Sequence, residues 1–341
     1  MEVLIQYIIN LPQLAVTWTI FFGAGIILFL VQVARSGREF SFRDLYECCI
    51  PFDIAKSKSF HMDVFIYFFR KLTDFVFVIP GAFVFAAVSS GLLLLLGHVF
   101  VQYTPLPVDY WITSLSTCVM ILTVEFSDYL THYLQHKVPF LWELHKVHHS
   151  ADFLNPLTSK RGHFLPLVFE GVISGAINGL PAGVLMFLFK FSLIEALALG
   201  AVASKLLTIC TLDPLKHSHV PVGLGWFDQI FISPHMHQVH HSKVQAHWDK
   251  NFGTNLSIYD WLFGTGYKPA KGEKLEFGIS GYSDASLQKF NTLFGAYVTP
   301  MKRSWKLLAK TMTALRTRIS SKGSGDALAG ENSPDVRLDH S

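Results

Sequence analysis

The sequence predicts an all-α, multi-pass membrane protein with a histidine-rich cap on the cytoplasmic side. Half of the 341 residues are hydrophobic and only 16% are charged, whereas soluble domains usually carry about 25% charged residues. Several apolar runs are long enough to cross a bilayer. All but His61, His98 and His340 of the sixteen histidines fall in one stretch, from His132 to His247.

Five apolar segments are candidates for membrane helices. The first, over residues 14–33, is too long for a removable signal peptide and lacks a basic start and a cleavage site. Segments 75–96 and 111–133 follow, and segments 165–188 and 191–212 are joined by very few residues. We expect these last two to form a helical hairpin that either spans the membrane or re-enters it.

The distribution of basic residues between these segments sets the orientation. The stretch from 97 to 110 contains no lysine or arginine. The stretch between the first two segments holds seven basic residues, which are Arg35, Arg38, Arg43, Lys56, Lys58, Arg70 and Lys71. Because short cytoplasmic loops are enriched in positive charge, the seven-residue cluster predicts a cytoplasmic loop. The third segment then returns to the cytoplasm and carries its histidines to that side.

Eight histidines fall into three short boxes beside the apolar segments. Residues three or four apart share a helix face, so each box can aim its imidazoles at one point. Imidazole is a common ligand for iron, zinc, copper and nickel. Eight ligands are too many for one four-coordinate zinc and suit two metal ions. The boxes are His132-x3-His136, His145-x2-His148-His149 and His237-x2-His240-His241.

Three further residues are candidates for the same site. His163 and His217 each lie next to an apolar segment on the predicted cytoplasmic side, and either could complete the set of ligands. Asp128 lies four residues before His132, so it shares a helix face with that box. A carboxylate in a membrane segment needs a partner. We expect Asp128 to accept a hydrogen bond from a ligating ring and to orient it.

The boxes and their flanks resemble the fatty acid hydroxylase or sterol desaturase superfamily over roughly residues 119–266. Four motifs carry the resemblance: Asp128-Tyr129-x2-His132-x3-His136, Trp142-x2-His145-Lys146-x-His148-His149-Ser150, Ser233-Pro234-x2-His237-x2-His240-His241-Ser242, and Asp249-Lys250-Asn251-Phe252-Gly253 leading to Trp261-Leu262-Phe263-Gly264-Thr265. The resemblance implies two iron ions held by the box histidines, with His163 and His217 matching further family histidines. It also implies that O2 is used to attack a C–H bond of a lipid.

This chemistry consumes two electrons, and the sequence offers no carrier of its own. It contains no dinucleotide fingerprint after a strand, no haem-attachment motif and no iron–sulfur cysteine pattern. The resemblance therefore implies a separate donor, such as a ferredoxin or a b-type cytochrome. We expect a lipid substrate that enters from the bilayer, no nucleic-acid partner, and a location in a bacterial inner membrane or the endoplasmic reticulum with a cytoplasmic active site.

Other functions remain open at this point. A lipid or sterol desaturase would use the same centre, and only the product would distinguish it from a hydroxylase. A membrane metal transporter would place polar ligands near the middle of the bilayer, whereas these histidines gather at the predicted inner edge. A zinc hydrolase would need only about three ligands and usually a carboxylate base.

The predicted organisation has four parts. Residues 1–110 hold the first membrane segments and the basic loop, and residues 111–268 form the catalytic domain. Residues 269–319 form a cytoplasmic segment in which 299–318 mixes apolar and basic residues like an amphipathic helix. Residues 320–341, rich in Ser, Gly, Asp and Asn, predict a disordered tail.

Overall fold

A computed structural model describes residues 52–270 and 272–323, with a few isolated positions between 19 and 30. The predicted segment 14–33 therefore lies almost entirely outside the described residues, as does most of the predicted tail. Within the described ranges the chain is helical, and the only β-type pairings there are two isolated bridges. The longer helices are α4 (Lys58–Val99), α5 (Tyr110–Lys137), α6 (Pro139–His149), α7 (Phe164–Phe189), α8 (Leu193–Cys210), α10 (Pro234–His240) and α13 (Thr299–Gly323). The shorter ones are α3 (Phe52–Ala55), η1 (Pro156–Lys160), α9 (Asp213–Lys216), η2 (Gly225–Gln229), η3 (Gln245–His247), α11 (Ile258–Leu262), α12 (Asp284–Leu287), η4 (Gln288–Asn291) and η5 (Phe294–Val298).

Helices α4, α5, α7 and α8 are each long and apolar enough to cross a membrane. Their positions agree with the predicted segments 75–96, 111–133, 165–188 and 191–212. Helices α7 and α8 form the expected hairpin, since Lys190 ends α7 in the left-handed region and Ser192 starts α8 with a capping box to Glu195. The all-α membrane fold is therefore confirmed for this part of the chain.

Helix α4 is much longer than the sequence predicts, because it begins at Lys58 rather than near residue 75. Its first half carries Asp63 and Arg70, which resemble loop charges in the sequence. Both side chains are buried in the structure. Asp63 pairs with Arg161 at 2.7 Å, and Arg70 pairs with Asp74 at 2.6 Å. These partners allow the helix to continue through its charged stretch, below the apolar segment.

The closest contact in the bundle joins α4 and α7. Glycines of α7 lie directly against the α4 backbone, so that a Cβ built on Gly175 would come within 2.4 Å of the Gly81 carbonyl oxygen. A Cβ built on Gly183 would come within 2.7 Å of the Ser89 carbonyl oxygen. Small residues let membrane helices approach closely where no hydrophobic effect drives them together. Beside this seam, Phe85, Met120 and Met186 form an apolar core.

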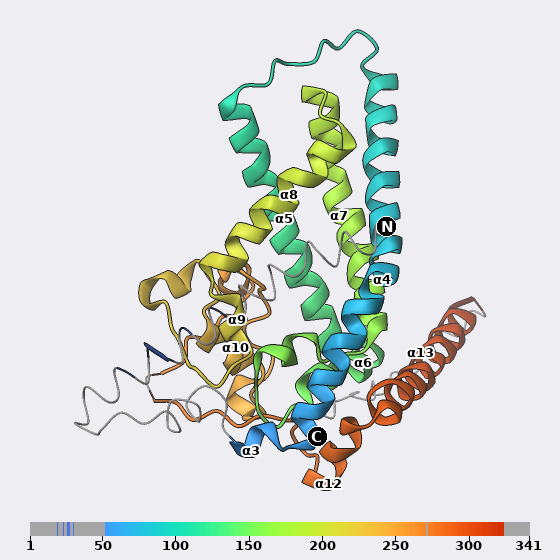
Figure 1. The fold of residues 1–341 in the computed structure, drawn as a ribbon. Helices are drawn as coiled ribbons and strands as arrows, with labels where there is room; N and C mark the ends of the chain where they lie inside the picture. The colour runs from blue at the N-terminus through green and yellow to red at the C-terminus, as the bar shows by residue number, and fades with distance from the viewer. Residues whose placement is uncertain are drawn as a thin grey trace.

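The short helices gather at one end of the four long ones, as Figure 1 shows. The connection between α4 and α5, residues 100–109, lies at the opposite end. A second apolar core joins this cap to the start of α4 and includes Ile66, Val147 and Phe290. The cap therefore packs against the α4 half that sequence reasoning missed, and it holds the three histidine boxes.

Candidate metal centre

Local sequence explains why each box lies on a helix with a fixed start or end. The first box is in the last two turns of α5, and the second closes α6, which begins with Pro139 at its first position. The third box forms α10, where Ser233 caps the helix by accepting a hydrogen bond from the Met236 N–H at 3.3 Å. Histidines four apart on these helices then point the same way.

The structure brings nine of the ten predicted ligands together in two neighbouring groups. We name them cluster A and cluster B, and in each group the ligand nitrogens lie within 4.8 Å of one another. The two clusters adjoin, since the rings of His149 and His241 stack with centroids 4.6 Å apart. Cluster A contains His132, His136, His145, His149 and His240, and cluster B contains His148, His217, His237 and His241.

Cluster B has closely converging nitrogens. The Nε2 atoms of His217, His237 and His241 lie 3.1 Å from one another, and His148 Nε2 lies 3.3 Å from His217 Nε2. Nitrogens that share one ion at about 2.0–2.1 Å would be about 2.9–3.4 Å apart, depending on the bond angle. The spacing of cluster B therefore fits ligands of a common transition-metal ion.

Backbone carbonyls fix which ring nitrogen faces each cluster. The Nδ1 atoms of His132, His148 and His240 each lie 2.8 Å from a carbonyl oxygen, that of Phe252, Arg161 and Lys250 respectively. An Nδ1–H that donates to a carbonyl leaves Nε2 with its lone pair, which is the form that binds a metal. Two Nε2 atoms of cluster A, those of His136 and His240, are buried without a hydrogen-bond partner among the described residues.

Burial also keeps the cap histidines neutral. Removal from water, the largest cause, lowers the pKa of His148 to about 4. It lowers the pKa well below the ordinary value for His145, His149, His217, His237, His240 and His241, and the neighbouring imidazoles lower it further. Neutral imidazoles can donate their lone pairs to a metal at neutral pH.

His163 is not part of either cluster, which corrects the sequence expectation. Its Nδ1 accepts a hydrogen bond from the Leu165 N–H at 3.1 Å, so the ring caps the start of α7. Its Nε2 lies 3.0 Å from the Tyr297 carbonyl oxygen. Both ring nitrogens are used by the backbone, and neither is left to bind a metal.

Asp128 does not fill the role that we expected for it toward His132. The Nδ1 atom of that ring is occupied by the Phe252 carbonyl. Within the described part of the chain, the half-buried Asp128 side chain makes no hydrogen bond or ion pair.

Sequence reasoning missed the residues that support the ligands. Asp260 is fully buried and accepts hydrogen bonds from the Phe252 N–H at 2.7 Å and the Gly253 N–H at 2.8 Å. It thereby positions the carbonyl that holds His132. Burial raises the pKa of Asp260. The only sequence signal for this role is the Asp249–Gly253 motif, where Asp249 and Asn251 adopt positive φ angles of 58° and 56°.

Arg161 has a similar role beside cluster B. Its carbonyl holds His148, while its buried guanidinium contacts Asp63, Ser150 and Asn291 at 2.6 to 3.1 Å. One side chain thus links α4, the end of α6 and the C-terminal segment to a cluster histidine. A buried arginine needs such partners, because an unpaired buried charge is strongly destabilising.

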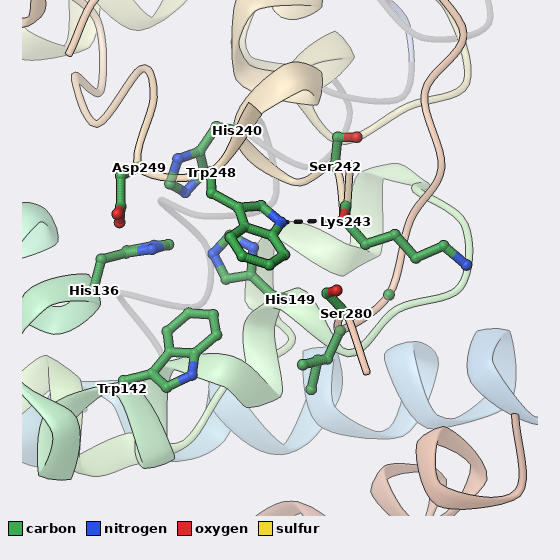
Figure 2. A pocket seen from close by; sticks show the side chains of 11 residues that line it. His136, Trp142, His149, His240, Ser242, Lys243, Trp248, Asp249 and Ser280 are labelled. Carbon is green, nitrogen blue, oxygen red and sulfur yellow. Dashed lines mark hydrogen bonds between the residues drawn. The ribbon is translucent and has the colours of Figure 1, made fainter. Parts of the chain in front are cut away.

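A half-open pocket reaches cluster A from outside the helix bundle. Figure 2 shows His136, His149 and His240 facing it together with the rings of Trp142 and Trp248. The ring of Trp142 lies 5.0 Å from His136 and 5.5 Å from His149, centroid to centroid. The rest of the pocket is lined by the polar residues Ser242, Lys243, Asp249 and Ser280 together with Gly278 and Ile279.

One membrane-length helix, α5, carries two of the histidines that form the adjoining clusters, and the cap supplies the others. This arrangement is that of a histidine-box membrane protein. Residues 117–265 match the model of the fatty acid hydroxylase family. This part of the chain is therefore similar to fatty acid hydroxylases, which confirms the superfamily resemblance found in the sequence.

Three relatives have names that state an activity. Ornithine lipid hydroxylase OlsE of Rhizobium tropici is 32% identical over 173 residues, which cover 51% of this chain and 48% of that protein. Alkylglycerol monooxygenase is 27% identical in Homo sapiens, over 52% of this chain and 37% of that protein. The Xenopus tropicalis form is 26% identical, over 51% of this chain and 33% of that protein. The chain thus spans less than half the length of these relatives. No solved structure matches it.

Proposed function

We propose that this chain is a membrane oxidoreductase that uses O2 and two external electrons to hydroxylate a C–H bond of a lipid. The observation that carries the proposal is the meeting of nine histidines, from α5, α6, α10 and the α9 end, in two adjoining clusters. The family match and the names of the relatives, all lipid hydroxylases or monooxygenases, support the same reaction class.

Two iron ions are the proposed cofactor, one held by cluster A and one by cluster B. The donor set fits, because it is all imidazole, neutral at working pH and equipped with buried nitrogens that have no other hydrogen-bond partner in the described part of the chain. Iron with open coordination positions supplies the O2 chemistry that amino-acid side chains cannot perform. The chain's own residues hold the ligands: the carbonyls of Phe252, Arg161 and Lys250 fix the ring tautomers.

The surroundings of the clusters separate lipid from water. Helices α5, α7 and α8 would present apolar side chains to a lipid that approaches from the bilayer. The pocket of Figure 2, lined by Lys243 and Asp249 beside two tryptophans, gives cluster A a second approach, with polar groups at its mouth. We assign electron delivery by a separate carrier, a ferredoxin or a b-type cytochrome, to that polar side.

The relatives' names narrow the substrate within this proposal. They speak of an ornithine lipid and of alkylglycerols, which favours a polar membrane lipid with an acyl or alkyl chain over a sterol. A desaturase on the same centre remains the second candidate, because both reactions start by removing one hydrogen from a carbon. Hydroxylation then adds oxygen to that carbon, whereas desaturation removes a second hydrogen from its neighbour.

The test is lipid analysis of membranes that contain the purified, iron-loaded chain, a reducing system and 18O2. The proposal requires a new lipid that is heavier by one labelled oxygen atom, and iron analysis that gives about two ions per chain. A lipid lighter by two hydrogens would instead establish the desaturase. Purified protein that binds no transition metal would refute both.

Matched variants connect the reaction to the clusters. His240→Ala removes a ligand of cluster A and His148→Ala one of cluster B. Each should lower the iron content and abolish product while the chain still inserts into membranes. His98→Ala is the control, because His98 is exposed in the last turn of α4, at the far end from the cap. Full turnover in either ligand variant would contradict the assignment.

A further inference from the structure

Helix α13 carries an apolar row that no described part of the chain covers. Met301, Trp305, Leu308, Met312 and Leu315 follow one another at intervals of four and three residues, so they share one face. Trp305 is 70% exposed, Met312 49% and Leu315 48%. Large apolar side chains exposed in a continuous row mark a surface that meets an apolar partner.

The other faces of α13 differ in chemistry. Ser304 is buried and Leu307 is half-buried, on the face that packs toward α6. Lys302, Lys306 and Lys310 recur every fourth residue on the side opposite the apolar row. Among the residues that the structure describes, none of these three lysines forms an ion pair. The helix thus has a protein face, an apolar face and a basic face.

The start of α13 is anchored where two membrane-length helices enter the cap. The Tyr297 ring, just before the helix, contacts Phe69 of α4 at 5.9 Å and Phe164 at the start of α7 at 6.0 Å. From there α13 extends outward beside the bundle, and Figure 1 shows its far end standing clear of the other helices. Exposed apolar side chains of α4, including Phe68 (55%) and Leu72 (62%), begin at the same level.

We infer that α13 lies in the headgroup region of an anionic bilayer, on the side of the membrane where the histidine clusters lie. Its apolar row would continue the lipid-facing surface of α4, and its basic row would meet phosphate groups. A helix with Trp and Leu on one face, lysines on the other and low overall hydrophobicity is suited to this position. Lysines near an anionic surface strengthen such binding. The inference does not depend on the catalytic proposal.

The test places an environment-sensitive fluorophore on single cysteines in the full-length chain, with the native cysteines replaced, in phosphatidylglycerol vesicles. Position 312 samples the apolar row and position 310 the basic row. We expect the probe on Met312→Cys to shift to the blue and to be quenched several-fold more by spin-labelled lipid than by iodide. The probe on Lys310→Cys should show the reverse preference.

Other occupants of the apolar row would give different results. A probe at 312 that neither quencher reaches would mean that a second copy or another protein covers the row, and would overturn the inference. Equal access of iodide to 310 and 312 would mean a helix in water, with the same consequence. Both readings come from folded, membrane-inserted protein, so a failure of catalysis would leave them unchanged.

Charge dependence provides the second arm. Two changes should each raise the ratio of iodide quenching to lipid quenching at position 312 several-fold. One is the replacement of phosphatidylglycerol by phosphatidylcholine, and the other is Lys306→Glu together with Lys310→Glu. Lys274→Glu, at an exposed lysine outside α13, is the matched control and should change nothing. If lipid quenching at position 312 stayed the same after both changes, the inference that α13 binds an anionic surface through its lysines would be wrong.

Discussion

At the scale of single residues, the spacing of the histidines predicted that their rings converge, and backbone carbonyls then set the orientation of several rings. Box periodicity was sufficient to predict that His132, His136 and the histidines of the two HxxHH boxes converge, because residues three or four apart share a helix face. It could not identify the carbonyls of Phe252, Arg161 and Lys250, since every residue has one and only folding places it. The same limit explains His163, because a histidine before an apolar segment reads equally as a ligand and as a helix cap.

Asp260 offers a test of the supporting contacts. Asp260→Asn keeps the size of the side chain but replaces one of the two oxygens that accept the Phe252 and Gly253 N–H groups. The Phe252 carbonyl should then hold His132 less firmly, and metal affinity should fall by about 10–100-fold, as for other residues that orient ligands. Metal titration of the purified protein measures this.

The control for that substitution is Asp152→Asn, at an exposed aspartate in the cap. It should bind metal like the unaltered chain. If Asp260→Asn also did so, the proposed link from Asp260 through Phe252 to His132 would be wrong.

His163 gives a prediction with a defined pH dependence. Burial, the largest cause, lowers its pKa to about 4 in the folded protein, against about 6.5 in an unfolded chain. Between these values the unfolded chain binds more protons, so stability falls as the pH drops from 6.5 to 4. His163→Asn keeps a good helix cap and removes this titration, so its stability should decline less over that window.

Thermal unfolding in detergent at several pH values measures the difference between the two proteins. Because His163 lies in neither cluster, His163→Asn should also retain the full metal content. Loss of one metal equivalent would mean that His163 is a ligand after all, and that its assignment as a helix cap outside the clusters is wrong.

At the scale of elements, hydropathy found the spans but not the whole of α4. Its first half is held by Asp63 with Arg161 and by Arg70 with Asp74. The first pair joins residues that only the folded chain brings together, whereas Arg70 and Asp74 are neighbours on one helix face and could have been recognised from their spacing. The seam between α4 and α7 was missed for a similar reason. Glycines in an apolar segment do not show which helix they pack against until the folded chain places a backbone opposite them.

That seam can be tested with one methyl group. Gly175→Ala would place a Cβ within 2.4 Å of the Gly81 oxygen, so the helices must separate. We expect a loss of about 1–3 kcal/mol, typical of overpacking. Gly91→Ala is the matched control, because no atom of residues 52–270 or 272–323 lies within 4 Å of its added Cβ. It should leave stability unchanged or raise it slightly.

Unfolding midpoints in the same detergent compare the two variants. Equal midpoints would show that α4 and α7 do not meet as closely as the structure describes. A loss of metal in Gly175→Ala without a loss of stability would point instead to a change confined to the cap.

At the scale of the whole molecule, the long helices serve to place the clusters on one side. Helix α5 descends into the first box, and α8 returns the chain to the third, so an even number of crossings separates the boxes. The sequence anticipated this arrangement from charge, because residues 97–110 lack lysine and arginine while the boxes are flanked by them.

Cysteine labelling from either side of a sealed membrane tests both the crossing and its direction. In a chain without native cysteines, Thr104→Cys lies in the loop between α4 and α5, and Gln245→Cys lies in the cap; both positions are exposed. The positive-inside rule predicts that an impermeant maleimide reaches 104 from outside the cell and 245 only after the membrane is opened. The reverse pattern would invert the orientation but keep the clusters on one side. Labelling of both cysteines from the same side would mean that α5 does not span, and the histidines of α5 would then need another route to the cap.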